Sequence, residues 1–286
     1  MSDALDPAVL RLLASAEALA AVGAWQRARV EGIALDPRID AALQAVVHAT
    51  GVPVEAAGPE ALGAIRALFA QAADLLEHPD RAPGWSHLSP ALLQGQGRAS
   101  GMIPGLFATA PALEVHLARP GARFLDVGAG AGWLAIAAAE RWPALQVVGI
   151  DVWEPALELA RANVAARGLT DRVALALDDV CGHRPAEAYD VAWLPMPFLS
   201  PDVRPAALRA TRAALHPGGT VVFGVYAGAG DPLTEALAHL RSVRSGGAGL
   251  PDDALGKLAA QAGFIDFDEI PRTWRAPMRV LTARRP

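Results

Sequence analysis

The stretch LDVGAGAG, residues 125–132, decides the fold that we expect for this chain. Its apolar run ends at Asp126, and glycine then fills every second position, at Gly128, Gly130 and Gly132. Without a Cβ, glycine lets a backbone turn tightly and approach a ligand closely. Free N–H groups at the start of a following helix favour a negatively charged group. The stretch predicts a strand-to-helix turn that holds a ligand against bare backbone, with a tight turn that binds nothing as the alternative.

Short β-type runs alternate with helical ones from about residue 120 to the end of the chain. The β-type runs are ARFLDVG, LQVVGID, DRVALALDD, YDVAWL and GGTVVFGVYAG, with FIDFDEI and MRVLTARR following later. This repeated order predicts parallel strands joined by right-handed crossovers. The expected fold class is α/β, with a doubly wound, mostly parallel sheet. Ligands bind such sheets at the carboxyl ends of the strands, which is where the glycine loop lies.

Upstream of the sheet, apolar residues recur at helical spacing. Residues 1–80 contain three such stretches, and we interpret them as a substrate cover or a dimerisation region. Residues 81–119 are rich in glycine, proline and small polar residues, so they form an expected connector and lid. Residues 120–286 form the expected ligand-binding domain.

Two ligand classes use a glycine loop at this position, the dinucleotides and S-adenosyl-L-methionine. The dinucleotide pattern GxGxxG, counted from Gly128, needs its third glycine at position 133, which is Trp133. In this chain the third glycine comes one residue earlier, at Gly132. The spacing therefore disfavours an NAD-dependent oxidoreductase.

Residues 120–285 resemble the class I S-adenosylmethionine-dependent methyltransferase family, which has a Rossmann-like, seven-stranded sheet. DVGAGAG, residues 126–132, matches the family's glycine loop. The resemblance implies that the loop lies along the methionine half of S-adenosyl-L-methionine and that Asp126 fixes the loop and helps to receive the ammonium. The implied loop contacts are Gly128, Ala129, Gly130 and Gly132.

The resemblance extends to the acids after the second and third strands. Asp151 matches the acid that accepts both ribose hydroxyls, and Val152 and Trp153 would flank the adenine. A carboxylate suits two neighbouring hydroxyls because it only accepts hydrogen bonds. Asp179 aligns best with the acid that takes the adenine amino group, with Val180 beside it, and Asp178 is the one-residue alternative. In isolation, Asp151 could instead cap a helix, and Asp178 and Asp179 could start a solvated loop.

A departure from the family pattern bears on the substrate. Family members that modify amide or exocyclic nitrogens have an amide or carboxylate after the fourth strand, whereas WLPMPFL, residues 193–199, has Leu194 there. We count Leu194 among the cofactor contacts and expect no adenine, cytosine or glutamine acceptor. The expected function is methyl transfer to an O, N or C nucleophile of a small molecule by direct displacement, releasing S-adenosyl-L-homocysteine. The alternatives are a protein of this fold that binds S-adenosylmethionine without methyl transfer, and an NAD-dependent oxidoreductase.

Candidates for a catalytic base are weak. His87 in GWSHLSP is the candidate, against the ordinary interpretation of an exposed loop histidine. His183 has no supporting neighbours in the sequence. Trp193, Met196 and Phe198 predict either an apolar substrate wall or ordinary core. Four polar residues of the connector either meet the cofactor or a polar substrate, or face water: Gln94, Gln96, Arg98 and Ser100.

Composition narrows the expected partners. The 286 residues carry a formal net charge of −5 without a basic cluster, so no nucleic-acid partner is expected. Cys181 is the only cysteine, and the catechol-type metal arrangement is not evident, so no metal is expected. No charge-free apolar run approaches the ~20 residues that span a bilayer, and no signal segment is evident. We therefore expect a cytoplasmic protein without a membrane partner that acts on a small-molecule substrate, with a homodimer possible.

Overall fold

The computed structural model describes residues 6–53, 59–84, 89–251, 253–274 and 276–286. The chain divides into two compact units, Met1–Pro79 and Asp80–Pro286. The first unit consists of α1 (Pro7–Val30), α2 (Pro37–Thr50) and α3 (Pro59–Glu77).

A small core holds the first unit together. Val22, Trp25 and Val47 are buried against Leu43 and Ile65. The aspartates that precede α1 and α2 each accept a backbone N–H of the first turn, and each is followed by proline, which suits the start of a helix. These caps stabilise the first turns of α1 and α2, which lie where the sequence predicts helices.

Among the described residues, α1 is long and apolar enough to cross a membrane by length and composition. Length and composition are weak evidence by themselves, because helices of soluble proteins also meet these criteria. Arg11 and Glu17 interrupt its apolar sequence, and Arg27 and Arg29 lie in its last turn.

The second unit begins with helices where we expected a connector. They are α4 (Pro90–Ser100), α5 (Ile103–Phe107) and α6 (Pro111–Ala118). Ser89 caps α4 by accepting the N–H of Leu92, and a proline follows the cap. The glycines of this region, which suggested loop structure, are tolerated in α4 because Gly97 packs against Ala131 and Trp133. The connector is therefore part of the folded domain.

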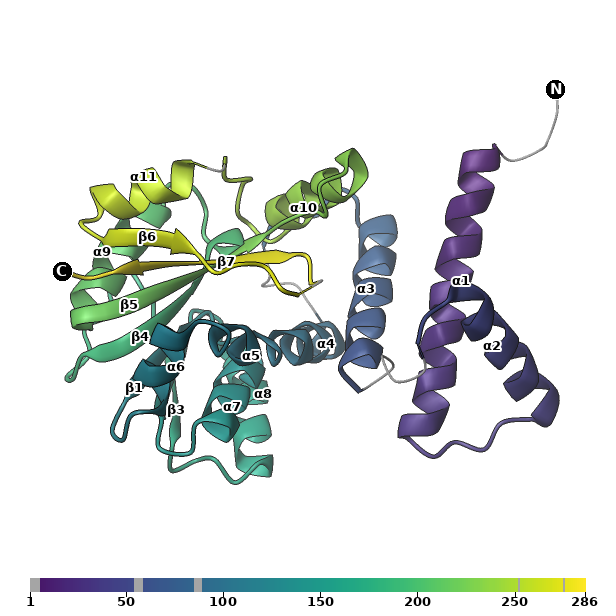
Figure 1. The fold of residues 1–286 in the computed structure, drawn as a ribbon, viewed down its shortest axis with the longest axis horizontal. Coiled ribbons are helices and arrows are strands. Elements are labelled where there is room, and N and C mark those ends of the chain that lie inside the picture. Colours follow the sequence, from purple (N-terminus) through teal and green to yellow (C-terminus); the bar gives the residue numbers. More distant parts are fainter. Residues whose placement is uncertain (1–5, 54–58, 85–88, 252, 275) are drawn as a thin grey trace. The chain divides into compact units, whose positions relative to one another are not determined.

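A seven-stranded sheet forms the centre of the second unit (Figure 1). The strands are β1 (Arg123–Val127), β2 (Gln146–Asp151), β3 (Val173–Leu177), β4 (Tyr189–Pro195), β5 (Leu215–Tyr226), β6 (Ile265–Glu269) and β7 (Met278–Arg284). Their order is β3-β2-β1-β4-β5-β7-β6, with β7 antiparallel to both neighbours and the other pairs parallel. The predicted doubly wound, mostly parallel seven-stranded fold is confirmed.

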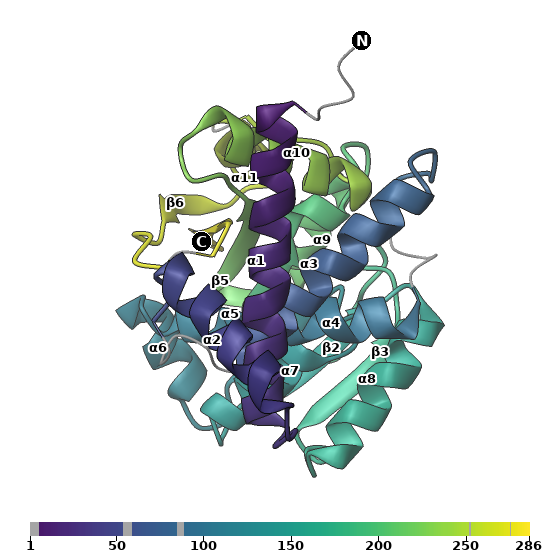
Figure 2. The same cartoon turned by 90° about the vertical axis from the view of Figure 1, so that its right-hand side faces the viewer.

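Helices cover both faces of the sheet, as Figure 2 shows from a second direction. The remaining helices are α7 (Trp133–Arg141), α8 (Glu154–Ala166), α9 (Arg204–Ala214), α10 (Pro232–Arg244), α11 (Ala254–Gln261) and the short η2 (Met196–Phe198). One buried cluster joins the sheet to α5, α6, α7 and α8, and the other joins it to α9 and α11. Successive residues of β4 alternate between the clusters, because side chains of a strand point to opposite faces. Thus Trp193 lies in the first cluster and Leu194 in the second.

The strand order reverses between β1 and β4. From β1 the chain winds outward through β2 to β3, and β4 returns to the other side of β1. Open sheets bind ligands beyond the carboxyl ends of the strands at such a reversal. The glycine loop after β1 and the segment after β4 meet there, since a Cβ on Gly128 would lie 3.5 Å from Pro195.

Candidate functional site

The glycine loop has the backbone conformation that its sequence demands. Gly128, Gly130 and Gly132 have φ angles of 71°, 54° and 80°, in the region where side chains are strained. At Gly132 a Cβ would also come within 3.0 Å of Ala160 on α8. The amides of Gly128 and Ala129 both donate to the carbonyl of Ile150, at 2.8 and 3.0 Å. The loop is thereby fixed to the end of β2, and α7 begins directly after it.

Asp151, at the end of β2, connects the glycine loop to the segment that follows β2. One carboxylate oxygen accepts the N–H of Gly130 at 2.8 Å, and the other accepts the N–H of Trp153 at 3.0 Å. Burial raises the pKa of this carboxyl, while these backbone donors oppose the increase. Both oxygens keep acceptor capacity, so the predicted contact with ribose hydroxyls stays open.

Asp126 is a buried acid with an unmet acceptor. It is 1% exposed, and its Oδ2 has no hydrogen-bond partner among the described residues. Burial, and then the nearby charge of Asp151, raise its pKa to about 8, although a backbone hydrogen bond from Ala135 opposes this. A buried acid with an unpartnered oxygen lowers the free energy of unfolding, so its presence calls for a functional explanation. A cation placed beside it would complete its bonding and favour its charged form.

The adenine side of the site is lined differently. Val152 follows β2 and is 70% exposed, which suits an apolar contact with a flat ring. Trp153 packs instead, half-buried, with Leu93 of α4 and Ala156 of α8. Val180 is buried in the second core cluster. The predicted adenine contact is therefore most accessible at Val152.

The structure distinguishes the two acids that follow β3, Asp178 and Asp179, by their hydrogen bonds. The carboxylate of Asp178 bonds to Nδ1 of His183 at 2.6 Å, and Nε2 of His183 lies 3.1 Å from the Tyr189 hydroxyl. Asp179 is exposed, and one of its oxygens accepts the N–H of Cys181 at 2.9 Å. Asp179 thus has more free acceptor capacity than Asp178. The sequence missed the neighbours of His183, because they lie five and six residues away across a loop.

Trp133, which follows the glycine loop, connects it to α4. Its indole N–H donates to Gln94 at 2.7 Å, and the amide of Gln94 also pairs with Asn163 of α8. The guanidinium of Arg98 lies over the Trp133 ring, 4.3 Å from its centroid. Gln94 and Arg98, two of the polar residues of the connector, therefore hold α4 against the start of α7. Both contact protein groups and not water alone.

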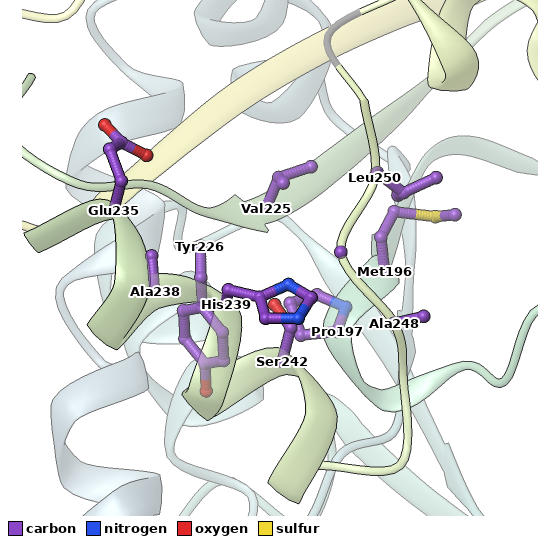
Figure 3. Close-up of a pocket in the computed structure, with 11 residues that line it drawn as sticks. Met196, Pro197, Val225, Tyr226, Glu235, Ala238, His239, Ser242, Ala248 and Leu250 are labelled. Carbon is purple, nitrogen blue, oxygen red and sulfur yellow. The ribbon is translucent and has the colours of Figure 1, made fainter. Parts of the chain in front are cut away.

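The end of β4 presents an apolar surface. Met196 and Pro197 line a cavity together with Val225, Tyr226, Ala238, His239 and other residues (Figure 3). Trp193 and Leu194 lie in the core, so the predicted contact of Leu194 with the cofactor can involve only its backbone. Phe198 packs edge-on against Tyr226. Of the three apolar candidates in this segment, Met196 lines the cavity wall.

Sequence reasoning missed α10, which supplies one side of this cavity. The helix has a readable start, since Asp231 caps Leu233 and Thr234, Pro232 follows the cap, and Glu235 lies four residues on. Its residue His239 lines the cavity. The predicted base His87 lies outside the described residues. No group of three or more His, Cys, Asp or Glu side chains that could hold a metal occurs within those residues.

Comparisons with known proteins agree with this geometry. Residues 124–219 match the family model described as a methyltransferase domain. The ribosomal protein uL3 glutamine methyltransferase of Bordetella pertussis is 44% identical over 78 residues, which are 27% of this chain and 26% of that protein. The release factor glutamine methyltransferase of Gloeobacter violaceus is 28% identical over 238 residues, which are 70% of this chain and 81% of that protein.

Solved structures share the fold. The S-adenosylmethionine-dependent methyltransferase SibL, in its apo form, matches 98% of this chain and 99% of its own with a TM-score of 0.66 and 21% identity. This likeness shows the fold. The chain spans only about a quarter of the length of the first curated relatives. Residues 124–219 thus match a methyltransferase domain, and the sheet order and the glycine loop agree with the class I S-adenosylmethionine-dependent methyltransferase fold that the sequence resembles.

Proposed function

We propose that this protein is an enzyme that transfers a methyl group from S-adenosyl-L-methionine to a small-molecule acceptor. The observation that carries the proposal is the pair of acids, buried Asp126 and half-buried Asp151, beside a loop of bare backbone. The methionine ammonium fits the unmet Oδ2 of Asp126, and the ribose hydroxyls fit Asp151. One solved neighbour, PigF, was determined with S-adenosylhomocysteine, at 18% identity and a TM-score of 0.66.

The residues of this chain would act by binding and alignment. When bound, S-adenosylmethionine supplies a methyl group already activated by its sulfonium. Gly128 and Gly130 admit the methionine portion close to the backbone, while Asp126 and Asp151 orient it. Met196 and Pro197, the apolar residues that follow β4, would exclude water from the acceptor side. Such alignment converts an encounter of two molecules into a displacement within one complex.

A small-molecule acceptor is favoured over a glutamine side chain. The first curated relatives are glutamine methyltransferases, but their similarity lies mostly in part of the chain. At the end of β4 this chain has Leu194, whose side chain is buried in the core and offers no hydrogen bond to an amide. Pro195 and Met196, which follow Leu194, are also apolar and buried. Solved neighbours include the mitomycin 7-O-methyltransferase MmcR, with a TM-score of 0.62 and 18% identity.

The other proposed properties follow from the sequence. We expect a cytoplasmic protein without a nucleic-acid or membrane partner, in which the helices of residues 1–79 cover the substrate or form a homodimer. The measurement that addresses the dimer is the mass of the full chain in solution, compared with a chain that lacks these helices.

Calorimetric titration tests the central proposal. The full chain should bind S-adenosylmethionine and S-adenosylhomocysteine and should not bind NAD. Asp151→Asn should weaken adenosyl binding about 10- to 100-fold, the worth of a charge-assisted hydrogen bond. Asp171→Asn, a change at an exposed carboxylate before β3, is the matched control and should leave binding unchanged. Absence of heat with both adenosyl ligands would overturn the proposal.

Binding without transfer is the remaining alternative. Release of S-adenosylhomocysteine in the presence of candidate acceptors distinguishes an enzyme from a binding protein. The chemical class of acceptor to use in that assay is inferred from the cavity at the end of β4.

A further inference from the structure

A cavity lies at the end of β4, the strand whose Pro195 lies beside the glycine loop. Its lining begins at Met196, one residue beyond Pro195, which contacts Gly128. Val225 and Tyr226 at the end of β5 form its floor, and α10 and the segment 248–250 form its sides. The end of β4 therefore connects the cavity to the glycine loop, which receives the methionine half in the proposed function.

The cavity is small, and its lining combines apolar and polar side chains. Its volume is about 140 Å³. A protein cavity of about 150 Å³ accommodates one benzene molecule. Met196, Val225 and Leu250 provide the apolar contacts that a flat ring requires. The volume therefore matches a single six-membered ring.

His239 brings a base to the mouth of this cavity. Its ring lies between Tyr226 on one side and Met196 and Ala248 on the other (Figure 3). Its Nδ1 edge faces Gly249, where a Cβ would come within 2.6 Å, so Nε2 is turned away from that backbone. Neither ring nitrogen has a hydrogen-bond partner within the described part of the chain. The side chain is also exposed, so a proton that it takes up can pass to water.

Other ionisable groups near His239 are few. Glu235 lies one turn earlier on the same helix and faces the amide of Gly228 at 3.4 Å. Tyr226 on β5 is held protonated, because burial raises its pKa, although Ser245 and Arg241 oppose this. The residues that η2 and segment 248–250 add to the lining are apolar or glycine. His239 is therefore the group in this lining whose free ring nitrogen can accept the proton of a bound hydroxyl.

Arg204 fixes the wall that faces His239. It is buried, and its guanidinium donates to the carbonyls of Leu199 at 3.0 Å and Ala248 at 2.7 Å. These bonds connect Leu199, in the segment after β4, to Ala248, in the segment that lines the other side of the cavity. Gly247 makes the approach possible, because a Cβ there would lie 2.4 Å from the Pro197 carbonyl. Hydrogen bonds of Arg204 and close backbone packing at Gly247 thus hold the cavity walls in place.

We propose that this cavity binds the methyl acceptor, that the acceptor is a single-ring aromatic alcohol, and that His239 accepts the proton of its hydroxyl. The inference rests on the proposed function. The acceptor O–H bond breaks and its proton goes to Nε2 of His239. The oxygen forms a bond to the methyl carbon, the carbon–sulfur bond breaks, and its electron pair stays on sulfur as the neutral thioether. His239 then releases the proton to water.

Titration with 4-nitrophenol tests the proposal, because the yellow phenolate reports loss of its proton. Full-length protein is titrated with the dye, with and without saturating S-adenosylhomocysteine. A ligand of this size is expected to bind with a Kd of about 1–10 mM. The variants are His239→Gln, which removes the base, and Leu250→Trp, which fills the cavity. His216→Gln, at an exposed histidine that is the second residue of β5, is the matched control.

The expected result separates the base from the cavity. The parent and His216→Gln bind the dye and increase its ionised fraction. His239→Gln binds it within about threefold but loses the increase, and Leu250→Trp weakens binding about tenfold or more. Retention of S-adenosylhomocysteine binding shows that a variant is folded.

Three results would overturn the inference. They are no saturable dye binding by parent protein, an equal increase in ionisation with His239→Gln, or full binding by a folded Leu250→Trp. If Leu250→Trp does not fold, nitrobenzene replaces it as the probe of the cavity: its displacement of the dye supports the cavity, and its failure to compete refutes it. If S-adenosylhomocysteine does not bind, the proposed function fails, and the dye titration without it still decides whether His239 and the cavity act as proposed.

Discussion

Replacing Asp126 with asparagine should make the protein more stable and a poorer ligand binder at the same time. Asparagine has nearly the same shape and keeps an acceptor for the backbone N–H of Ala135. It removes the ionisable group whose pKa burial raises from 3.8 to about 8. The unmet Oδ2 is replaced by an equally unpartnered amide NH₂, so the uncharged contacts change little.

The magnitude follows from the difference in proton binding. Between about pH 4 and pH 8 the folded parent keeps a proton that its unfolded chain has released. Its free energy of unfolding therefore falls as pH rises through this window and becomes constant above it. At 1.36 kcal/mol per pKa unit, the penalty relative to asparagine is about 3 kcal/mol at pH 6, about 4 at pH 7 and about 5 at pH 8. The variant should therefore melt about 10 °C higher at pH 7, given about 2–4 °C per kcal/mol for a domain of this size.

Urea unfolding of the ligand-free protein between pH 6 and pH 9 measures this difference. The gap between parent and Asp126→Asn should widen by about 2 kcal/mol from pH 6 to pH 8 and then stay constant. In parallel, S-adenosylmethionine should bind the variant about 10- to 100-fold more weakly, since a charge-assisted hydrogen bond is lost. Asp171→Asn serves as the control in both assays. A gap that does not depend on pH would refute the argument from burial, and unchanged affinity would refute the role in ammonium binding.

The remaining predictions concern the same loop and its cover. Gly132→Ala and Gly168→Ala both place alanine at positive φ, but only Gly132 faces Ala160 at 3.0 Å, so chemical unfolding should show an extra loss of about 1–3 kcal/mol there. Trp133→Phe removes the bond to Gln94 and should cost about 1 kcal/mol more than Trp142→Phe, whose indole N–H has no partner within the described residues; equal losses would contradict this role. S-adenosylmethionine should bind more tightly as pH rises toward about 8, because binding expels the Asp126 proton; calorimetry in buffers of different ionisation enthalpy should detect up to one proton released.

The sheet was predictable because its signals are local. The apolar runs of β1 to β5 alternate with helical runs, and each run fixes its own element. The glycines of the loop were predictable for the same reason, since three positive φ angles at alternate positions leave no other residue type free of strain. Asp126 and Asp151 follow from their places at strand ends. Their raised pKa values could not be predicted, because burial depends on everything packed around them.

The proposed acceptor side was harder to predict, because its residues come from separate elements. Met196 follows β4, Tyr226 ends β5, and His239 lies on α10, so only the closed fold brings them together. Arg204 joins two segments that are more than forty residues apart through backbone carbonyls, which leave no trace in the side-chain pattern. The donor side thus depends on one short motif, whereas the acceptor side depends on tertiary contacts. If the proposed acceptor site holds, a chain can keep the loop and change its acceptor through α10 and the segment after β4.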